Sequence, residues 1–298
     1  MPRIAVFTKN QTNPAYEAAR LGADRTAARL GATTIHYVPE KPDSVPEQIA
    51  LIARAIAERP DAAVFVPVDE TAVNDAILGF ERAGIPLFNI ITRTTAGRRV
   101  TFVGSDDRAL ARNIARYLFG KLPRRCTIVI LEGTPASATS RERLMGFEDA
   151  LAEHPGIQVR CSLRGDYQRD VAREVFLGAK DQWPGVEAAL CANDVMALGV
   201  LDALAPNPGS GPLVVGVNAI PEAVAAIAAG RMLATADFNA MAMSEIATEA
   251  AVRHLRGEAI PAEIMLPVQV VDARNCAAWN APFEARPSPV WDDVVSRG

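Results

Sequence analysis

The sequence lacks the residue sets that most enzymes use for catalysis. It has only three histidines, His36, His154 and His254, and none of them follows the carboxyl end of an expected strand. No Ser-His-Asp or Cys-His catalytic set can therefore be nominated. The phosphate-binding patterns GxxxxGK[ST] and GxGxxG are absent, as is the zinc motif HExxH. Nothing in the sequence indicates an enzyme, a metal or a cofactor.

Paired cysteine motifs, basic tracts and long apolar runs are also missing. Cys126, Cys161, Cys191 and Cys276 form no CxxC pair, which argues against a zinc ribbon or a thioredoxin-type site. We interpret them as small buried hydrophobic residues, although an even count leaves disulfides open. The net charge of −4 and the absence of a basic stripe argue against nucleic-acid binding. No apolar run approaches the ~20 residues of a membrane span.

What the chain does contain is two successive series of short apolar strands and amphipathic helices. Each series has the length of one domain, and Gly104-Ser105-Asp106-Asp107 lies at the break. Strands that alternate with helices predict α/β lobes, each a doubly wound parallel sheet. The expected strands are 4–8, 33–38, 62–66, 87–91, 100–103, 127–131, 158–163, 187–191, 213–217, 233–236 and 264–271. The expected helices are 15–30, 45–58, 71–83, 108–122, 141–153, 169–181, 195–204, 221–229 and 241–256.

The segment VEAALCANDVMALG, residues 186–199, is the most informative stretch. It predicts a strand, an abrupt polar turn and a helix, and ligands bind at the carboxyl ends of strands in parallel sheets. Asn193 would lie there with an amide that both donates and accepts hydrogen bonds. The alternative is that Asn193 or Asp194 only caps the following helix.

Similar polar turns follow other strands. Residues 9–16 (KNQTNPAY), 139–147 (TSRERLMGF) and 165–167 (GDY) each come after an expected strand, and Asn218 ends another. For each turn a purely structural role is the alternative. Asn13 could cap a helix, Arg141 could be a solvated or paired charge, and Tyr167 could pack in the ordinary way. Five such turns at the same edge of two sheets are stronger evidence for a binding site than any one alone.

With these motifs together, the sequence resembles the ribose-type, type I periplasmic sugar-binding proteins that serve ABC importers. The matching segments run in the family's order and cover roughly residues 3–270. They are NPAY (13–16), SDD (105–107), SRERLMGF (140–147), GDYQRD (165–170), ANDVMALGVLDAL (192–204) and VVGVNAIPEAV (214–224).

The resemblance implies two lobes joined by a three-segment hinge, with the ligand in the cleft. One lobe would comprise residues 1–104 and 237–267, and the other residues 105–236 and 268–298. The crossings would fall near 103–105, 235–237 and 266–268, and closure would be a hinge motion around the ligand. The tail from residue 273 is expected to be an irregular strap whose aromatic side chains pack on a lobe, with partner docking as the alternative.

The resemblance also implies which residues bind the ligand. In the first lobe these are Asn13 and Tyr16, and Lys9 lies where related arabinose-type proteins place a sugar-binding lysine. In the second lobe, Arg141 would form a fork onto sugar hydroxyls. Tyr167 would pack on the apolar face of the sugar, as the aromatic residue of the family does.

Asn193 of the ND motif and Asn218 complete the expected contacts from the second lobe. Asn218 stands where aspartate is usual. Phe238 replaces a glutamine, with Asp237 or Asn239 as possible substitutes for it.

A further departure falls at the end of the fourth strand. The family's Asp-Arg pair reads Ile91-Thr92 here, with Arg93 one place later. Two carboxylates typical of aldose sites are therefore missing, which weakens the case for a common aldopyranose. Lys9, Arg141 and Arg93 would make the cleft cationic, so the hypothesis is a polyol, a less common sugar or a sugar acid.

The leading interpretation is therefore the solute-binding component of an ABC importer. It would act as a monomer, bind a small carbohydrate-like ligand and deliver it to the membrane subunits of the importer. No secretory signal precedes the first strand, so a periplasmic protein would have lost its signal peptide from this chain. The alternative is the effector-binding domain of a lactose-repressor-type regulator without its DNA-binding head. An enzyme on an α/β scaffold is a weaker third interpretation.

Overall fold

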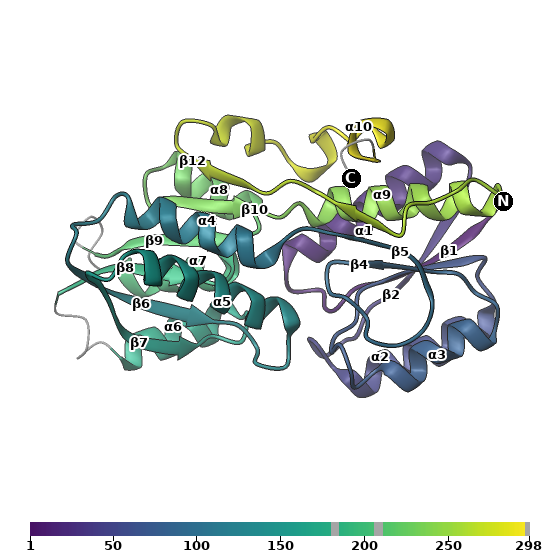
Figure 1. The fold of residues 1–298 in the computed structure, drawn as a ribbon, viewed down its shortest axis with the longest axis horizontal. Helices are drawn as coiled ribbons and strands as arrows, with labels where there is room; N and C mark the ends of the chain where they lie inside the picture. The colour runs from purple at the N-terminus through teal and green to yellow at the C-terminus, as the bar shows by residue number, and fades with distance from the viewer. Residues whose placement is uncertain (180–184, 206–210, 296–298) are drawn as a thin grey trace. The chain divides into compact units, whose positions relative to one another are not determined.

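The structure is a computed structural model that describes residues 1–179, 185–205 and 211–295. Contacts within the chain divide it into two compact units (Figure 1). Unit 1 comprises Met1–Ser105, Asn239–Leu266 and Phe283–Gly298, and unit 2 comprises Asp106–Phe238 and Pro267–Pro282. No helix among the described residues is both long enough and apolar enough to cross a membrane.

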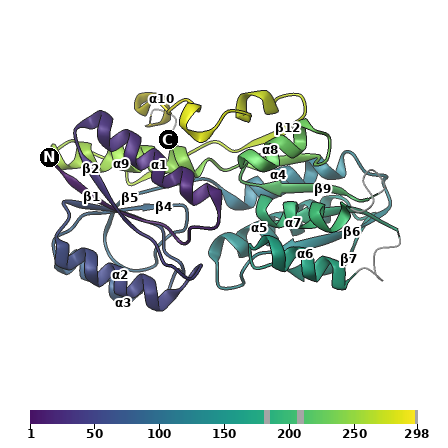
Figure 2. The same cartoon turned by 180° about the vertical axis from the view of Figure 1, so that it is seen from behind.

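Unit 1 is built on a six-stranded sheet in the order β11-β5-β4-β3-β1-β2, in which every strand pair is parallel. Helices α2 and α3 lie on one side of the sheet, and α1 and α9 lie on the other (Figures 1 and 2). The strands are β1 (Arg3–Phe7), β2 (Thr33–Tyr37), β3 (Ala62–Phe65), β4 (Leu87–Ile90), β5 (Arg99–Gly104) and β11 (Glu263–Met265). The helices are α1 (Pro14–Leu30), α2 (Val45–Glu58), α3 (Asn74–Arg82), α9 (Ala240–Leu255) and α10 (Trp291–Val295), with the short 3-10 helix η3 (Phe283–Ala285).

The central strands of unit 1 are apolar on both faces because helices cover both faces. All four residues of β3 and of β4 are buried. On one side an aromatic cluster fills the space between the sheet and α3. Phe7 stacks on Tyr37 with ring centres 4.8 Å apart and meets Phe65 and Phe80 at 5.1 and 5.7 Å.

Unit 2 repeats this architecture with strand order β12-β10-β9-β8-β6-β7. Its strands are parallel except β12, which is antiparallel to β10. The strands are β6 (Cys126–Glu132), β7 (Ile157–Arg164), β8 (Val186–Cys191), β9 (Leu213–Val217), β10 (Ala234–Asp237) and β12 (Gln269–Asp272). The helices are α4 (Asp107–Phe119), α5 (Ala138–Glu153), α6 (Arg169–Gly178), α7 (Asp194–Leu204) and α8 (Pro221–Ala228), with the 3-10 helix η2 (Cys276–Trp279).

Two glycines set the helix packing in unit 2. Helix α5 packs on α4, and α7 packs on α6. A Cβ atom on Gly146 would lie 2.2 Å from the carbonyl oxygen of Arg108, and one on Gly199 would lie 2.2 Å from that of Arg169. Both distances are far shorter than van der Waals contact, so only glycine permits these helix backbones to approach so closely.

The prediction of two parallel α/β sheets is confirmed, with one difference in detail. The single strand predicted over residues 264–271 is two strands, β11 and β12, which belong to different sheets. Pro267 lies between them, and proline cannot donate a hydrogen bond to a strand ladder. The helix predicted over residues 169–181 ends at Gly178, and residues 180 and 181 lie outside the described part of the chain.

The chain passes from one unit to the other after Ser105, Phe238, Leu266 and Pro282. The sequence led us to expect three crossings and to group all of residues 268–298 with the second lobe. The tail beyond Pro282 instead belongs to unit 1, where Trp291 is buried at 9% exposure. A tail without regular periodicity does not show in advance which surface its aromatic side chains will cover.

Candidate functional site

Asn193 lies at the carboxyl edge of the unit 2 sheet, directly after β8. Its Oδ1 accepts a hydrogen bond from the backbone N–H of Met196 at 2.9 Å, so the side chain caps α7. Its Nδ2 is buried and has no hydrogen-bond partner among the described residues. Because a buried amide donor without a partner is costly, this atom is a candidate contact for a ligand. Asn193 therefore caps α7, as one of the two alternatives predicted, and ligand contact by its Nδ2 stays a prediction.

Asp194 does not cap the helix, contrary to the capping alternative raised for it. Its carboxylate accepts hydrogen bonds from the N–H of Ile220 at 3.0 Å and from the hydroxyl of Thr235 at 2.6 Å. These bonds join the ends of β8, β9 and β10. Burial raises the pKa of Asp194 to about 7, although both hydrogen bonds oppose that change.

Arg143, rather than Arg141, occupies the buried position at this edge. Its side chain pairs with Asp107 at 2.8 Å, and its Nη1 donates to the carbonyl oxygen of Ala192 at 2.7 Å. Arg143 is 3% exposed, whereas Arg141 is exposed and donates a long 3.4 Å hydrogen bond to the Pro135 carbonyl.

The helical period explains the difference between the two arginines. Residues two apart on a helix do not share a face, and the buried face of α5 carries residues 139, 140, 143, 146 and 147. Applying this period to the RER motif would have selected the second arginine of the motif from the sequence.

Tyr167 and Asn218 both stand at this edge on unusual backbone. Tyr167 has φ +61° and Asn218 has φ +122°. The Tyr167 ring lies against Gly133, where a Cβ atom would come within 2.2 Å of the ring. Burial raises the pKa of the Tyr167 hydroxyl. Asn218 is 8% exposed, and its buried Oδ1 has no partner among the described residues.

The end of β10 carries Asp237 and is followed by Phe238, the residue expected where the family has a glutamine. Asp237 is 8% exposed and accepts a hydrogen bond from the indole N–H of Trp279 at 2.8 Å. Phe238 is buried, and the Arg143 guanidinium lies 5.2 Å from its ring centre, in the range of a cation–π contact. Asn239 belongs to unit 1 and caps α9, where its Oδ1 accepts the N–H of Ala242 at 3.0 Å.

In unit 1, the turn after β1 holds Lys9, Asn13 and Tyr16. Lys9 is 4% exposed and its charge acts on Asp43, whose pKa burial raises. Asn10 donates to Asp43 at 3.2 Å and accepts the backbone N–H of Asn13 at 3.0 Å. Asn13 caps α1 by accepting the N–H of Ala15 at 3.0 Å, and Tyr16 is 9% exposed. The sequence analysis had not singled out Asn10 or Asp43.

The loop after β4 holds Thr92 and Arg93. Asn89, fully buried, shapes this loop by donating to the Thr92 carbonyl at 2.8 Å and accepting the N–H of Thr94 at 2.9 Å. The hydroxyls of Thr92 and Thr94 are buried, and neither has a partner in the described ranges. Arg93 is 44% exposed and pairs with Glu263 at 2.5 Å.

If Arg143 is taken as the site arginine in place of Arg141, each cation assigned to the site has a carboxylate beside it. Lys9 acts on Asp43, and Arg93 pairs with Glu263. Arg143 pairs with Asp107. Among the described residues at these two edges, the buried atoms without a partner belong to neutral amides and hydroxyls.

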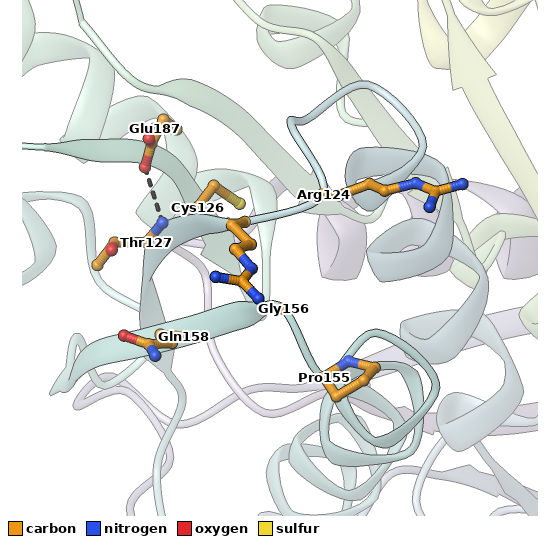
Figure 3. Close-up of a pocket in the computed structure, with 8 residues that line it drawn as sticks. Arg124, Cys126, Thr127, Pro155, Gly156, Gln158 and Glu187 are labelled. Carbon is orange, nitrogen blue, oxygen red and sulfur yellow. Dashed lines mark hydrogen bonds between the residues drawn. The ribbon is translucent and has the colours of Figure 1, made fainter.

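Two cavities lie at the opposite, amino-terminal edges of the sheets. The one in unit 2 has a volume of about 720 Å³ and is lined by residues at the start of β6, β7 and β8, including Thr127, Gln158 and Glu187 (Figure 3). The one in unit 1, about 610 Å³, includes Arg99 and His254. Neither cavity is lined by a residue predicted to bind the ligand. Among the described residues, no group of three or more His, Cys, Asp or Glu side chains could hold a metal ion.

Comparison with known proteins places the chain in a family. A sequence profile described as "Periplasmic binding protein domain" matches residues 4–259. The chain belongs to this family. The ribose import binding protein of Bacillus subtilis is 27% identical over 267 residues, which cover 90% of this chain and 85% of that protein. The corresponding protein of Escherichia coli is 26% identical and covers 90% of each chain.

Solved structures agree with the sequence relatives. A periplasmic solute-binding protein of an ABC transporter from Actinobacillus succinogenes, with bound D-allose, has a TM-score of 0.88 and 28% identity. The match covers 93% of this chain and 99% of that one. A Mycobacterium smegmatis solute-binding protein with bound glycerol has a TM-score of 0.87 and 26% identity, and the match covers 94% and 97% of the two chains.

Membership in the family confirms the predicted fold and the resemblance. It also makes the chain a binding protein rather than an enzyme, as the sequence indicated. The relatives named above are import proteins, so they support the leading interpretation over a transcriptional regulator.

Proposed function

We propose that this periplasmic binding protein captures a neutral polyhydroxylated ligand, a sugar or a polyol, for the membrane subunits of an ABC importer. The relatives support import as the process and sugars as the general class, because their names specify ribose import and bound D-allose. Another solute-binding protein with this fold holds glycerol, which is a polyol.

The observation that carries this proposal is the pair of buried amides at the unit 2 edge. Within the part of the chain that the structure describes, the Asn193 Nδ2 donor and the Asn218 Oδ1 acceptor have no hydrogen-bond partner. A hydroxyl group both donates and accepts hydrogen bonds, so hydroxylated ligands satisfy both amides. Since buried polar groups in folded proteins almost always have partners, the two atoms define complementary positions on the ligand.

Charge compensation supports a neutral ligand over a sugar acid. The Arg143 guanidinium already meets the Asp107 carboxylate at 2.8 Å, and the Asp237 carboxylate lies near Asp194 at the same edge. A ligand carboxylate would have to compete with these groups for one arginine in a buried setting, where like charges repel strongly. This argues against the sugar-acid part of the hypothesis drawn from the sequence.

Isothermal titration calorimetry with D-ribose, D-allose, myo-inositol, glycerol and D-gluconate tests the proposal. We expect heat of binding for at least one of the four neutral compounds and none for gluconate. Binding should also raise the melting temperature, because only the folded state binds. Binding of gluconate alone would show that the charge argument is wrong, and an absence of binding to all five would count against the proposed ligand class.

Asn193→Ser distinguishes the capping of α7 by Asn193 from its proposed hydrogen bond to the ligand. Serine is also a good N-cap, so the melting temperature should change little. The amide donor is lost, which should weaken binding about tenfold for one net hydrogen bond of roughly 1–1.5 kcal/mol. Asp106→Ser, a change at the cap of α4 outside the predicted site, shows how much of any loss comes from replacing a capping side chain. Unchanged affinity in Asn193→Ser would mean that Asn193 only caps α7.

A further inference from the structure

The C-terminal tail, residues 273–295, is a feature that the proposed function does not use. It leaves unit 2 after Pro282 and joins unit 1 at Phe283. Within each unit it is held by its own set of contacts, and these two anchors can be described separately.

The anchor on unit 2 is η2, which packs against α8. Trp279 donates its indole N–H to Asp237 at 2.8 Å, and Cys276 is 7% exposed. Asn275 accepts the N–H of Asp272 at 2.8 Å and donates to the Val270 carbonyl at 2.9 Å. The indole therefore holds the last residue of β10, immediately before the chain crosses to unit 1 after Phe238.

The anchor on unit 1 lies on α1, α9 and β11, where the yellow end of the chain runs beside α9 (Figures 1 and 2). Arg25 of α1 donates to the Arg286 carbonyl at 2.8 Å, and its Nε donates to Glu245 of α9, also at 2.8 Å. Ser288 donates to the same Glu245 carboxylate at 2.8 Å. Trp291 is 9% exposed, and the Arg253 guanidinium lies 4.8 Å from its ring centre.

The link between the two anchors is short. Only Asn280, Ala281 and Pro282 separate Trp279 from Phe283. Four steps of extended chain span at most about 14 Å, and proline stiffens the last of them by restricting φ. Such a link leaves little slack between the residues on either side of it.

In each unit, two of the other three crossings attach to neighbouring strands and the third joins a helix, α9 in unit 1 and α4 in unit 2. In unit 1, two of them leave from the neighbouring strands β5 and β11, joined by a 2.7 Å hydrogen bond from Leu266 to the Gly104 carbonyl. In unit 2, two attach at the neighbouring strands β10 and β12, where Asp237 is opposite Gln269. Connections gathered on adjacent strands permit rotation about them as a hinge, and a further short connection outside these strand pairs adds a constraint on that rotation.

We propose that the tail is a fourth connection that restrains hinge motion, with Trp279 as its anchor on unit 2. Because the indole holds Asp237 at the ligand-binding edge, the restraint acts on the same strand end that we assign to the site. The tail would limit how far the ligand-free protein opens and so keep more of it near the binding-competent form.

Lengthening the link tests the proposal without any ligand. A Gly-Ser-Gly-Ser-Gly insertion between Ala281 and Pro282 keeps both anchors and removes the restraint. The matched control carries the same insertion between Ala83 and Gly84, in an exposed turn of unit 1 away from both anchors. Small-angle X-ray scattering of ligand-free protein should show a larger radius of gyration for the tail insertion than for the control. Amide exchange at residues 238–240 should be about tenfold faster, as expected for a loosened local structure.

Trp279→Phe provides a second variant that keeps the aromatic ring and loses the donor to Asp237. It should shift scattering and exchange in the same direction as the tail insertion, by a smaller amount. If the tail insertion matches the control in both measurements, the tail does not restrain the hinge and the proposal is overturned. That result would leave the proposed ligand class untouched, because no ligand is present in the experiment.

Discussion

Replacing Arg143 tests whether the buried arginine, rather than the exposed one, organises the unit 2 edge. Arg143→Met keeps most of the side-chain volume and removes the charge. It leaves the carboxylate of Asp107, which is 8% exposed, without its guanidinium partner at 2.8 Å. Removing one partner of a buried ion pair typically costs about 3–5 kcal/mol, because the remaining charge is buried without compensation.

This loss of folding free energy can be converted into an expected change in melting temperature. Unit 2 has the size at which 1 kcal/mol shifts the melting temperature by about 2–4 °C, so Arg143→Met should lower it by roughly 6–20 °C. Arg141→Met is the matched control, since a surface substitution usually stays within about 0.5 kcal/mol. The measurement is differential scanning calorimetry of both variants beside the parent protein.

A double variant distinguishes loss of the pair from loss of packing. Arg143→Met with Asp107→Asn removes both charges, so it should recover part of the stability that Arg143→Met loses. Arg143→Met should also abolish binding of the neutral ligand found by calorimetry, whereas Arg141→Met should retain it. Equal losses in the Arg141 and Arg143 variants, or no loss in either, would refute the assignment of the site to Arg143.

Two further predictions concern buried groups of unit 2. Because burial raises the pKa of Asp194 to about 7, the folded protein keeps a proton that the unfolded chain releases near pH 4. The free energy of unfolding of the parent protein should therefore fall relative to that of Asp194→Asn as the pH rises from about 4 to 7, by up to about 4 kcal/mol. Urea unfolding of both proteins at several pH values measures this difference. A difference that does not depend on pH would contradict the prediction. Gly146→Ala should destabilise the packing of α5 on α4 by about 1–3 kcal/mol, because its Cβ would lie 2.2 Å from the Arg108 carbonyl oxygen. Gly178→Ala is the control, because nothing lies within 4 Å of a Cβ atom at this position, and it should leave the melting temperature unchanged or raise it in differential scanning calorimetry. Equal effects of the two substitutions would mean that the close approach of the helices is not the cause.

The sequence predicted the ends of most strands and helices because local patterns determine them. The apolar run before Asn193 and the helical period after it are properties of consecutive residues, and both appear in the structure as β8 and α7. The resemblance in motif order predicted the fold for the same reason, since the motifs mark the turns at the strand ends.

Pairing between distant segments could be settled only by tertiary structure. Asp194 belongs to an ND motif that is typical of a helix cap, yet its partners are Ile220 and Thr235, 26 and 41 residues away. The pairing of Arg143 with Asp107 joins residues 36 positions apart, and the role of Asp237 depended on Trp279 from the tail.

The sequence by itself determined that this chain is a two-lobed α/β binding protein whose polar turns follow its strands. Periodicity and turn chemistry act over a few residues, so they can be read directly from the chain. The structure decided which buried polar atoms are already satisfied and which have no partner among the described residues. That distinction depends on hydrogen bonds between segments far apart in the sequence, and no local pattern encodes them.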